Sequence, residues 1–572
     1  MKRLAAAALA CALAACSPKV STAPVPAAGA PPATVPVPPA DSVPAGDYDI
    51  LITNARIVDG AGNPWYRGSV ATRGDRIAYV GPSLPGLTAK RLIDAQDRIV
   101  APGFIDMLGH SENVILRRPQ AISKITQGIT SEVTGEVSSA WPHTYLGDAP
   151  DTSRTWNSLD GYFRELEQRG IAINLGTYVG TNSVRGAVMG LATRNPTPTE
   201  LAQMGALIDS AMRDGAFGLG TGLIYLPSSY FTTDELIALT KYVVPYHGGY
   251  ATHMRNEEGT MLDAIRETIR IAAGAGTWAQ IRHLKSTSRE QMAEALRIID
   301  SARAAGIDVT ADQYPYIASG TGLSAYLSPW VLEGGRDSMV ARLKDPAVRA
   351  RLKVALAADS AAGIRTAQGT MVNGVGADSL RIYQGKRLTE VAKMMGGGRD
   401  PHDAMFDLLI ADQGRTSAIY FSFNEDALRL AMQKPWVSVG QDAGAVSPGP
   451  DGRFFGRGHP RGFGTFPRML GRYVRQDSVI SLEFAIRKMT SLAAQRVGLA
   501  ERGLLRPGMY ADITVFDPAT IIDNATFEDP QQLSSGVIHV FVNGIAVMED
   551  GRPTGALPGR ALRGPAYRTR IP

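Results

Sequence analysis

Short apolar segments alternate with helical patterns through the middle of this 572-residue chain, and this alternation limits its possible folds. The apolar segments are Ala172–Gly176, Ala216–Leu219, Tyr250–Thr252, Ala279–Arg282 and Ile307–Thr310, and helical patterns cover 232–244, 261–273 and 289–304. Thr232 and Glu235 predict a capping box at the start of one helix. Strands separated by helices pair in parallel, and about 400 residues of this repeat fit a (β/α)8 barrel. The sequence therefore predicts an α/β protein with a TIM-like barrel over residues 102–499, with functional side chains just after the strand ends.

Both ends of the chain carry strand patterns without the intervening helices. Near the N-terminus these are 49–53, 55–58, 69–72 and 76–80, with Asn54 among the predicted turn residues. Near the C-terminus they are 511–516 and 537–542, and Asn543–Gly544 predicts a hairpin turn. We expect one small β domain built from residues 48–101 and 500–560.

Residues 319–410 interrupt the regular repeat. They contain mixed helical stretches and a Gly396–Gly398 break, without a clear strand ladder. We interpret this segment as an insertion over the mouth of the barrel that forms a lid. Two ordinary long connections are the alternative.

The N-terminus has the pattern of a processing signal. A basic start is followed by an apolar stretch over 4–15 that is too short to span a bilayer. Residues Leu13–Cys16 resemble a bacterial lipoprotein box, which implies a signal peptide over 1–15 and lipidation of Cys16; an ordinary secretory peptide cut near Ala15 is the alternative. Ser17 follows Cys16, and this implies delivery to the outer membrane. The Pro- and Ala-rich remainder of 16–47 predicts an extended tether facing the periplasm.

Composition excludes several other classes of protein. The only two cysteines, Cys11 and Cys16, lie in the signal region, so the processed chain has no disulfide and no cysteine-ligated metal site. The net charge of +5 is small for this length, and the chain has no long basic run. A nucleic-acid partner is therefore not favoured. The oligomeric state is not predicted.

Polar residues at the strand ends indicate a metal site. His253 and His283 each follow an apolar segment, one strand–helix repeat apart. Two imidazoles and one carboxylate suit a divalent metal with an open position. Glu136 is the candidate carboxylate, because Gly135 permits a tight turn beside it. Glu132, in the same segment, is either structural or exposed.

Asp442 ends the apolar segment 436–442. An aspartate beside an activated water can act as general base and then protonate a leaving amine. Capping of a loop is the alternative role for this residue.

Several motifs occur in an order that defines a resemblance. They are Phe217–Pro227, Thr252–Glu257, Arg282–Lys285, Asp312–Tyr316, Gly458–Arg468 and Leu505–Asp517. From Tyr48 to Pro553 the chain resembles the N-acyl-D-amino-acid deacylase (D-aminoacylase) family of the amidohydrolase superfamily. This resemblance implies zinc on His253 and His283 and an acid/base role for Asp442.

The same resemblance implies substrate contacts by Tyr225, Lys285, Tyr314 and Arg461. The two cations suit a substrate carboxylate, and a tyrosine hydroxyl can donate to an oxyanion. A rim charge for Lys285 and a structural ion pair for Arg461 are the alternatives.

Two departures from the family pattern bear on the metal. The family's cysteine ligand is missing, and Glu136 or Val137 stands in its place. Leu108 replaces the first histidine of the family's His-x-His strand, which leaves only His110 in the segment Pro102–Glu112. We therefore expect one tight zinc site and a weak or absent second one. His110 is either a ligand of that second metal or a residue that orients water or substrate.

Three functional hypotheses follow from these observations. The first is zinc-dependent hydrolysis of N-acyl D-amino acids or related carboxylated amides, by an enzyme lipid-anchored in the cell envelope. The second keeps the chemistry but acts on a dipeptide, a cyclic amide, or an amide-bearing natural product or toxin. The third is a non-catalytic lipoprotein that binds a ligand.

Overall fold

The computed structural model describes residues 47–143, 154–361, 365–454 and 456–567. The predicted signal peptide, Cys16 and all of the tether but its last residue lie outside these ranges. Within them, no helix has both the length and the apolar character needed to cross a membrane.

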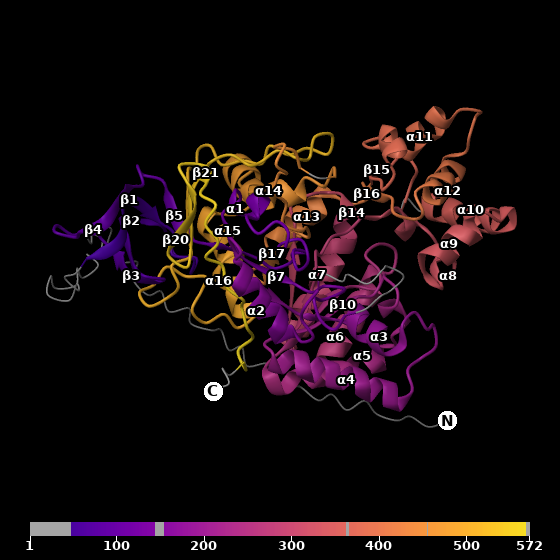
Figure 1. Ribbon diagram of the computed structural model, residues 1–572, viewed down its shortest axis with the longest axis horizontal. Coiled ribbons are helices and arrows are strands. Elements are labelled where there is room, and N and C mark those ends of the chain that lie inside the picture. The colour runs from indigo at the N-terminus through magenta and orange to yellow at the C-terminus, as the bar shows by residue number, and fades with distance from the viewer. Residues whose placement is uncertain (1–46, 144–153, 362–364, 455, 568–572) are drawn as a thin grey trace, which may run out of the picture. The chain divides into compact units, whose positions relative to one another are not determined.

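Two parallel sheets carry the residues of the central repeat (Figure 1). One sheet has the order β6-β7-β8 and the other has the order β17-β13-β12-β11-β10-β9. Their strands are β6 (Phe104–Asp106), β7 (Ile129–Thr134), β8 (Asn174–Thr177), β9 (Val179–Gly180), β10 (Gly218–Gly222), β11 (Gly249–His253), β12 (Ala279–Ile281), β13 (Val309–Gln313) and β17 (Val437–Val439). Every residue of these strands is buried, as expected for parallel strands that are covered on both faces.

Hydrogen bonds connect the two parallel sheets at both ends. The amide of Phe217, just before β10, donates to the carbonyl of Thr177 in β8 at 3.0 Å. At the other end the amide of Met107, just after β6, donates to Val439 of β17 at 3.2 Å. Both ends of the six-stranded sheet are thus bonded to the three-stranded one.

Helices occupy the connections between these strands and the segment that follows β17. They are α1 (Ile122–Ile125), α2 (Leu159–Arg169), α3 (Thr181–Met189), α4 (Pro198–Arg213), α5 (Thr233–Thr240), α6 (Met261–Ala275), α7 (Arg289–Ala304), α13 (Glu425–Met432), α14 (Arg461–Arg468), α15 (Leu482–Met489) and α16 (Ser491–Arg496). The predicted capping box of Thr232 and Glu235 is confirmed at the start of α5. Helix α5 is shorter than predicted, because the chain tightens into a 3-10 helix over Lys241–Tyr246 that contains Pro245.

A nine-stranded sheet combines strands from both ends of the chain. Its order is β21-β20-β19-β18-β5-β1-β2-β3, with β4 paired to β1, and β5 and β18 join the two ends in antiparallel register. The strands are β1 (Tyr48–Ile57), β2 (Tyr66–Arg73), β3 (Arg76–Gly81), β4 (Ala89–Asp94), β5 (Ile99–Pro102), β18 (Ile513–Phe516), β19 (Val537–Val542), β20 (Ile545–Glu549) and β21 (Arg552–Pro553). Beyond β21, the amide of Gly559 donates to the carbonyl of Ile171, just before β8, and the amide of Leu562 donates to that of Leu175 within β8.

Two turn predictions in this sheet have different outcomes. The hairpin at Asn543–Gly544 is confirmed between β19 and β20, and both of its residues have positive φ. The prediction of a turn at Asn54 is wrong, because Asn54 lies inside β1. Its φ is +52°, and the register between β1 and β2 shifts at this point. Asparagine tolerates this left-handed conformation, so the chain forms a bulge and continues as one strand.

The insertion extends to Tyr420, beyond its predicted end at residue 410, and contains a sheet that the sequence did not predict. Strands β14 (Ser319–Gly322), β15 (Thr370–Gly374) and β16 (Ser417–Tyr420) form an antiparallel sheet of order β14-β16-β15. The expectation of no strand ladder is wrong because β14 is short, rich in glycine and paired with Tyr420 far along the chain. Helices α8 (Pro329–Leu332), α9 (Gly335–Leu343), α10 (Pro346–Ala361), α11 (Leu388–Met395) and α12 (Pro401–Ala411) complete this part of the chain.

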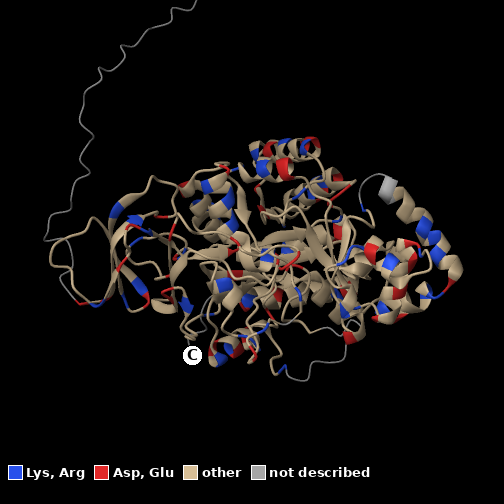
Figure 2. Cartoon of the chain, turned by 90° about the horizontal axis from the view of Figure 1, so that it is seen from above, with Lys and Arg blue, Asp and Glu red and all other residues tan. Residues whose placement is uncertain are grey.

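The insertion also has its own hydrophobic core, in which Leu343, Phe406 and Leu409 are fully buried. Figure 2 shows charged residues of both signs interspersed over the described elements, those of the insertion included.

Candidate metal centre and active site

The predicted site residues lie at the carboxyl ends of the parallel strands. His110 follows β6, Glu136 follows β7, His253 ends β11, His283 follows β12, and Asp442 follows β17. All of them except His283 line a cavity of about 520 Å³. Because the strands are parallel, their carboxyl ends meet at one edge, and residues far apart in sequence come together there.

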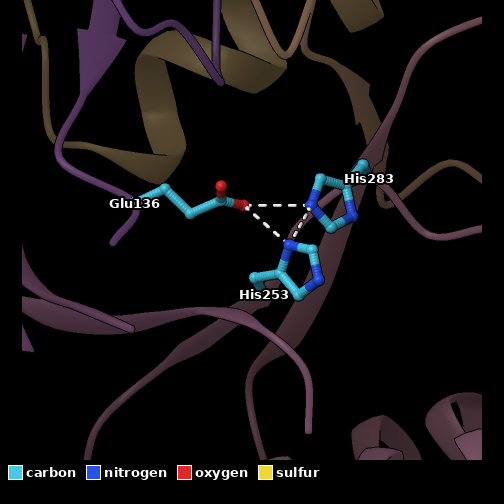
Figure 3. A group of neighbouring side chains, drawn as sticks. All are labelled: Glu136, His253 and His283. Atoms are coloured by element: carbon cyan, nitrogen blue, oxygen red, sulfur yellow. Dashed lines mark hydrogen bonds and ion pairs between the residues drawn. The ribbon is translucent and has the colours of Figure 1, made fainter. Parts of the chain in front are cut away.

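Glu136, His253 and His283 direct one donor atom each at a common point (Figure 3). The Nε2 atom of His283 lies 2.8 Å from Nδ1 of His253 and 3.0 Å from Oε1 of Glu136. The Nδ1 atom of His253 lies 3.7 Å from the same carboxylate oxygen. Gly135, with φ of +87°, provides the tight turn that directs Glu136 inward.

This group fits a zinc ion. Its donors are two imidazole nitrogens and one carboxylate oxygen, a ligand set that zinc commonly uses. The buried Oε1 of Glu136 accepts no hydrogen bond from the described residues. Burial lowers the pKa of His253 to about 4, which keeps a ligand nitrogen unprotonated at neutral pH. Burial would raise the pKa of Glu136, but His283 and His253 lower it to about 2.

His110 forms a second group with Glu136 and Asp442. Its Nε2 atom lies 3.0 Å from Oδ1 of Asp442 and 3.7 Å from Oε2 of Glu136. Burial lowers the pKa of His110, but the hydrogen bond and charge of Asp442 outweigh it and raise the value to about 9. Leu108 is fully buried and contributes its backbone, since its carbonyl accepts from the amide of Asp442 at 2.7 Å.

Arg461 contacts Asp442 directly. Its Nη1 atom lies 2.7 Å from Oδ2 of Asp442, and its Nη2 donates to the carbonyl of Gly320 at 3.1 Å. Burial would raise the pKa of Asp442, but Arg461 and then His283 and His110 hold it well below the usual range. The carboxylate is therefore ionised at neutral pH and held through both of its oxygens.

The other three predicted substrate contacts lie close to the same histidines. The Tyr225 ring packs against that of His253 with centroids 5.2 Å apart, and its hydroxyl lies 2.9 Å from Oγ1 of Thr321. Lys285 lines the cavity beside His283. The Tyr314 ring lies against Lys285 at 5.6 Å and Arg461 at 4.8 Å, behind the residues that line the cavity.

Glu257 is a site residue that the sequence analysis did not single out. Its Oε1 atom lies 2.8 Å from Nδ1 of His283 and accepts from Nζ of Lys285 at 2.8 Å. Its Oε2 atom lies 3.6 Å from Nε2 of His253. One carboxylate thus faces the outer nitrogens of both histidines, an arrangement that orients metal-binding imidazoles. Its place four residues after His253, in the motif Thr252–Glu257, is the available sequence signal.

A buried charge cluster lies beneath the ends of β6 and β17. Lys124 donates to Oδ2 of Asp106 at 2.7 Å, and its Nζ lies 3.5 Å from Glu132; all three side chains are fully buried. Glu132 accepts from the amide and hydroxyl of Ser111 at 3.1 and 2.7 Å. A Cβ atom on Gly109 would collide with Glu132. Glu132 is therefore structural, one of the two roles considered from the sequence.

This cluster holds the backbone on both sides of Asp442. The amide of Gln441 donates to Oδ1 of Asp106 at 2.8 Å, and the carbonyl of Ala443 accepts from Lys124 at 2.8 Å. Asp442 itself has φ of +54°, a conformation that non-glycine residues rarely adopt. Such strain persists only where the surroundings impose it, and the cluster supplies those restraints.

His283 is restrained in the same way. Its φ is +35°, and its amide donates to Oδ1 of the fully buried Asp312 at 2.8 Å. Asp312 also accepts from the Gln280 side chain at 2.6 Å. Buried carboxylates under two strand ends therefore position both a histidine of the metal group and Asp442.

Comparison with known proteins places the chain in a family. Residues 91–548 match the amidohydrolase family. A D-aminoacylase of Alcaligenes xylosoxydans xylosoxydans is 33% identical over 526 residues, 90% of this chain and 97% of the relative. An N-acyl-D-glutamate deacylase of the same organism is 33% identical over 529 residues, 90% and 96% of the two chains. A crystal structure of N-acyl-D-glutamate deacylase from Bordetella bronchiseptica, complexed with zinc and a phosphonate inhibitor, superposes with a TM-score of 0.76 at 31% identity over 91% and 100% of the chains. This chain belongs to the D-aminoacylase branch of the amidohydrolase family.

Replacing Glu257 by Gln tests its role behind the histidines. The variant keeps the side-chain shape but removes the charge that faces both imidazoles. We expect zinc affinity to fall about 10- to 100-fold, because a partner that orients metal ligands contributes on this scale. Competition of the purified protein with a chelating dye measures the affinity. Glu258→Gln is the matched control, because Glu258 contacts Arg365 at 3.1 Å instead. Equal zinc affinity in both variants would contradict the assignment.

Replacing Lys124 by Met tests the buried cluster. Removing one partner leaves Asp106 and Glu132 without compensation, which costs about 3–5 kcal/mol of the free energy of unfolding. Ser111→Ala removes one hydroxyl and costs about 1–3 kcal/mol, so this variant is expected to fold. In Ser111→Ala we expect kcat to fall with KM nearly unchanged, because the backbone of Asp442 loses support. Urea unfolding and steady-state kinetics measure both quantities; an unchanged kcat in Ser111→Ala would show that the cluster serves stability alone.

Proposed function

We propose that this protein is a zinc-dependent amidohydrolase that cleaves the amide bond of N-acyl D-amino acids or related carboxylated amides. The observation that carries the proposal is the convergence of Glu136, His253 and His283 beside an ionised Asp442 in one cavity. Family membership supports the reaction class, and the activities after which the two relatives are named support the substrate class.

A zinc ion held by Glu136, His253 and His283 would supply Lewis-acid activation of water and of the amide carbonyl. Asp442 accepts the proton of the attacking water at a carboxylate oxygen and later delivers it to the leaving nitrogen. His110 and Arg461 hold the two oxygens of Asp442 in place. The low pKa of Asp442 keeps the carboxylate ionised at neutral pH, which is the form that accepts a proton.

The remaining cavity residues suit an amide that carries a carboxylate. Lys285 and Arg461 are buried cations that can pair with the substrate carboxylate. Tyr225 lies against His253, and its hydroxyl can donate a hydrogen bond to the oxygen of the tetrahedral intermediate. We infer one tight metal site, because the second group of His110, Glu136 and Asp442 shares Glu136 and lacks the histidine that Leu108 replaces.

We also infer that the two parallel sheets form one closed (β/α)8 barrel. The bonds from Phe217 to Thr177 and from Met107 to Val439 join the sheets at both ends and support this. The insertion contributes Ser319, Thr321 and Arg365 to the cavity wall, which supports a role as a lid over the barrel mouth.

For location, we propose a lipid anchor on Cys16 that holds the enzyme in the cell envelope, facing the periplasm and attached to the outer membrane. The support is the sequence pattern of 1–16 and Ser17 after the lipidated position. The proposed partners are the amide substrate and the membrane, without nucleic acid.

Replacing Asp442 by Asn tests the mechanism. The amide cannot take up the proton, so we expect kcat to fall about 10²- to 10⁴-fold, the usual contribution of acid–base catalysis. Zinc content, measured by mass spectrometry, stays near one ion per chain. Activity close to wild type in this variant would refute the mechanism.

The substrate class is tested on paired N-acetyl D- and L-amino acids, with dipeptides and lactams alongside. Hydrolysis confined to L-dipeptides or lactams would exclude the D-aminoacylase activity. A zinc-binding protein that hydrolyses none of these amides would favour ligand binding without catalysis.

Replacing Cys16 by Ser tests the lipid anchor. The serine hydroxyl does not replace the thiol that accepts the lipid, so we expect the protein to move from the membrane fraction to the soluble fraction. Cys11→Ser is the matched control and keeps its membrane association. Immunoblots of separated envelope fractions measure the distribution, and a soluble wild-type protein would contradict the anchor.

A further inference from the structure

A second cavity of about 590 Å³ lies beside the active-site cavity. It is formed by the loop after β10 and by the insertion. It shares Ile224, Tyr225, Leu226, Thr321 and Ala325 with the active-site cavity. The two spaces therefore have a common wall, which includes Tyr225.

The lining of the second cavity differs in charge from that of the first. The active-site cavity is lined by four carboxylates, those of Glu136, Glu257, Glu258 and Asp442, and by three cations, those of Lys285, Arg365 and Arg461.

The second cavity has an apolar and cationic lining instead. Its apolar side chains include Ile224, Leu226, Leu332 and Met339. None of its lining residues, all of which belong to the described part of the chain, is acidic, whereas two of them are the arginines Arg336 and Arg415. An apolar stem with an anionic end complements this combination.

Arg415 is held in place beside this cavity by the insertion itself. Its Nε atom donates to the carbonyl of Asp412 at 3.0 Å, and its Nη2 atom lies 3.8 Å from Oδ1 of the same residue. Asp412 therefore positions the guanidinium, while the Arg415 side chain remains 49% exposed and accessible to a ligand. Its planar group can bind a carboxylate through two hydrogen bonds.

The position of Tyr225 indicates which end of the substrate points toward the second cavity. The Tyr225 ring packs on His253, and its hydroxyl lies 2.9 Å from Thr321 at the common wall. Neither Lys285 nor Arg461, the cations proposed to pair with the substrate carboxylate, lines the second cavity. With the carboxylate on those cations and the scissile amide at the metal group, the acyl group extends past Tyr225.

We propose that the second cavity is a subsite for the acyl arm of the substrate, and that this arm has an apolar stem of several carbons and an anionic end. The proposal rests on the proposed function, because it assumes hydrolysis of an N-acyl D-amino acid at the metal group. It narrows the substrate class from N-acyl compounds in general to monoamides of longer dicarboxylic acids.

Three N-acyl derivatives of D-alanine test this subsite: acetyl, hexanoyl and adipoyl. Each methylene that the cavity buries is expected to raise kcat/KM about three- to fourfold. We therefore expect kcat/KM to rise at least tenfold from acetyl to adipoyl, with hexanoyl between them. A fourth compound, N-acetyl-D-2-aminoheptanedioate, carries the same four-methylene carboxylate arm on the amino-acid side chain. It shows whether the second cavity takes the acyl group or the side chain.

Variants of the lining identify the cavity responsible. Arg336→Ala and Arg415→Ala are expected to remove the difference in kcat/KM between the adipoyl and hexanoyl compounds. Ser324→Phe fills the second cavity alone and is expected to reduce the gain in kcat/KM of both compounds over the acetyl compound. All three keep wild-type activity on the acetyl compound. Arg381→Ala is the matched control, because Arg381 is an exposed arginine of the insertion that lines neither cavity.

The outcomes separate the two proposals. Cleavage of the acetyl compound without a gain for adipoyl, or with a gain only for the side-chain arm, overturns the acyl subsite and leaves the proposed function intact. A gain that persists in the Arg336, Arg415 and Ser324 variants also overturns it. Failure to cleave any of the four compounds overturns the proposed function itself.

Discussion

Parallel pairing of buried strands is the constraint on which the site depends. The strands of the two parallel sheets are buried along their whole length, so polar side chains reach the cavity where these strands end. Because parallel strands share one carboxyl edge, Glu136, His253 and Asp442 meet although they are far apart in sequence. The same edge carries His110, which therefore contacts Asp442 at 3.0 Å.

Buried charges beneath this edge set the geometry of the strand ends. Lys124 and Asp106 hold the backbone on either side of Asp442, and Asp312 holds that of His283. A buried ion pair is costly to desolvate and adds little net stability, so its value here lies in orientation. Glu257 has the corresponding role for the side chains, since it faces both imidazoles.

The sequence predicted the parts of this structure that depend on local pattern. Helix α7 and the capping box of α5 match their predictions because amphipathic spacing and capping are local properties. Asn54 and β14 were misjudged because a bulge and a short glycine-rich strand are defined by their partners, which lie elsewhere in the chain. Glu257 and Lys124 were not singled out, since a carboxylate or lysine in sequence does not reveal what it contacts.

By itself, the sequence determined the alternating architecture, the ligand-type residues at the strand ends and the family to which the chain belongs. Periodicity and residue chemistry are properties of the chain, so they can be inferred without coordinates. Only the tertiary structure decided that Glu136 shares a point with His253 and His283, that Arg461 pairs with Asp442, and that a second cavity adjoins the first. These relations depend on distances between segments remote in sequence, which packing alone establishes.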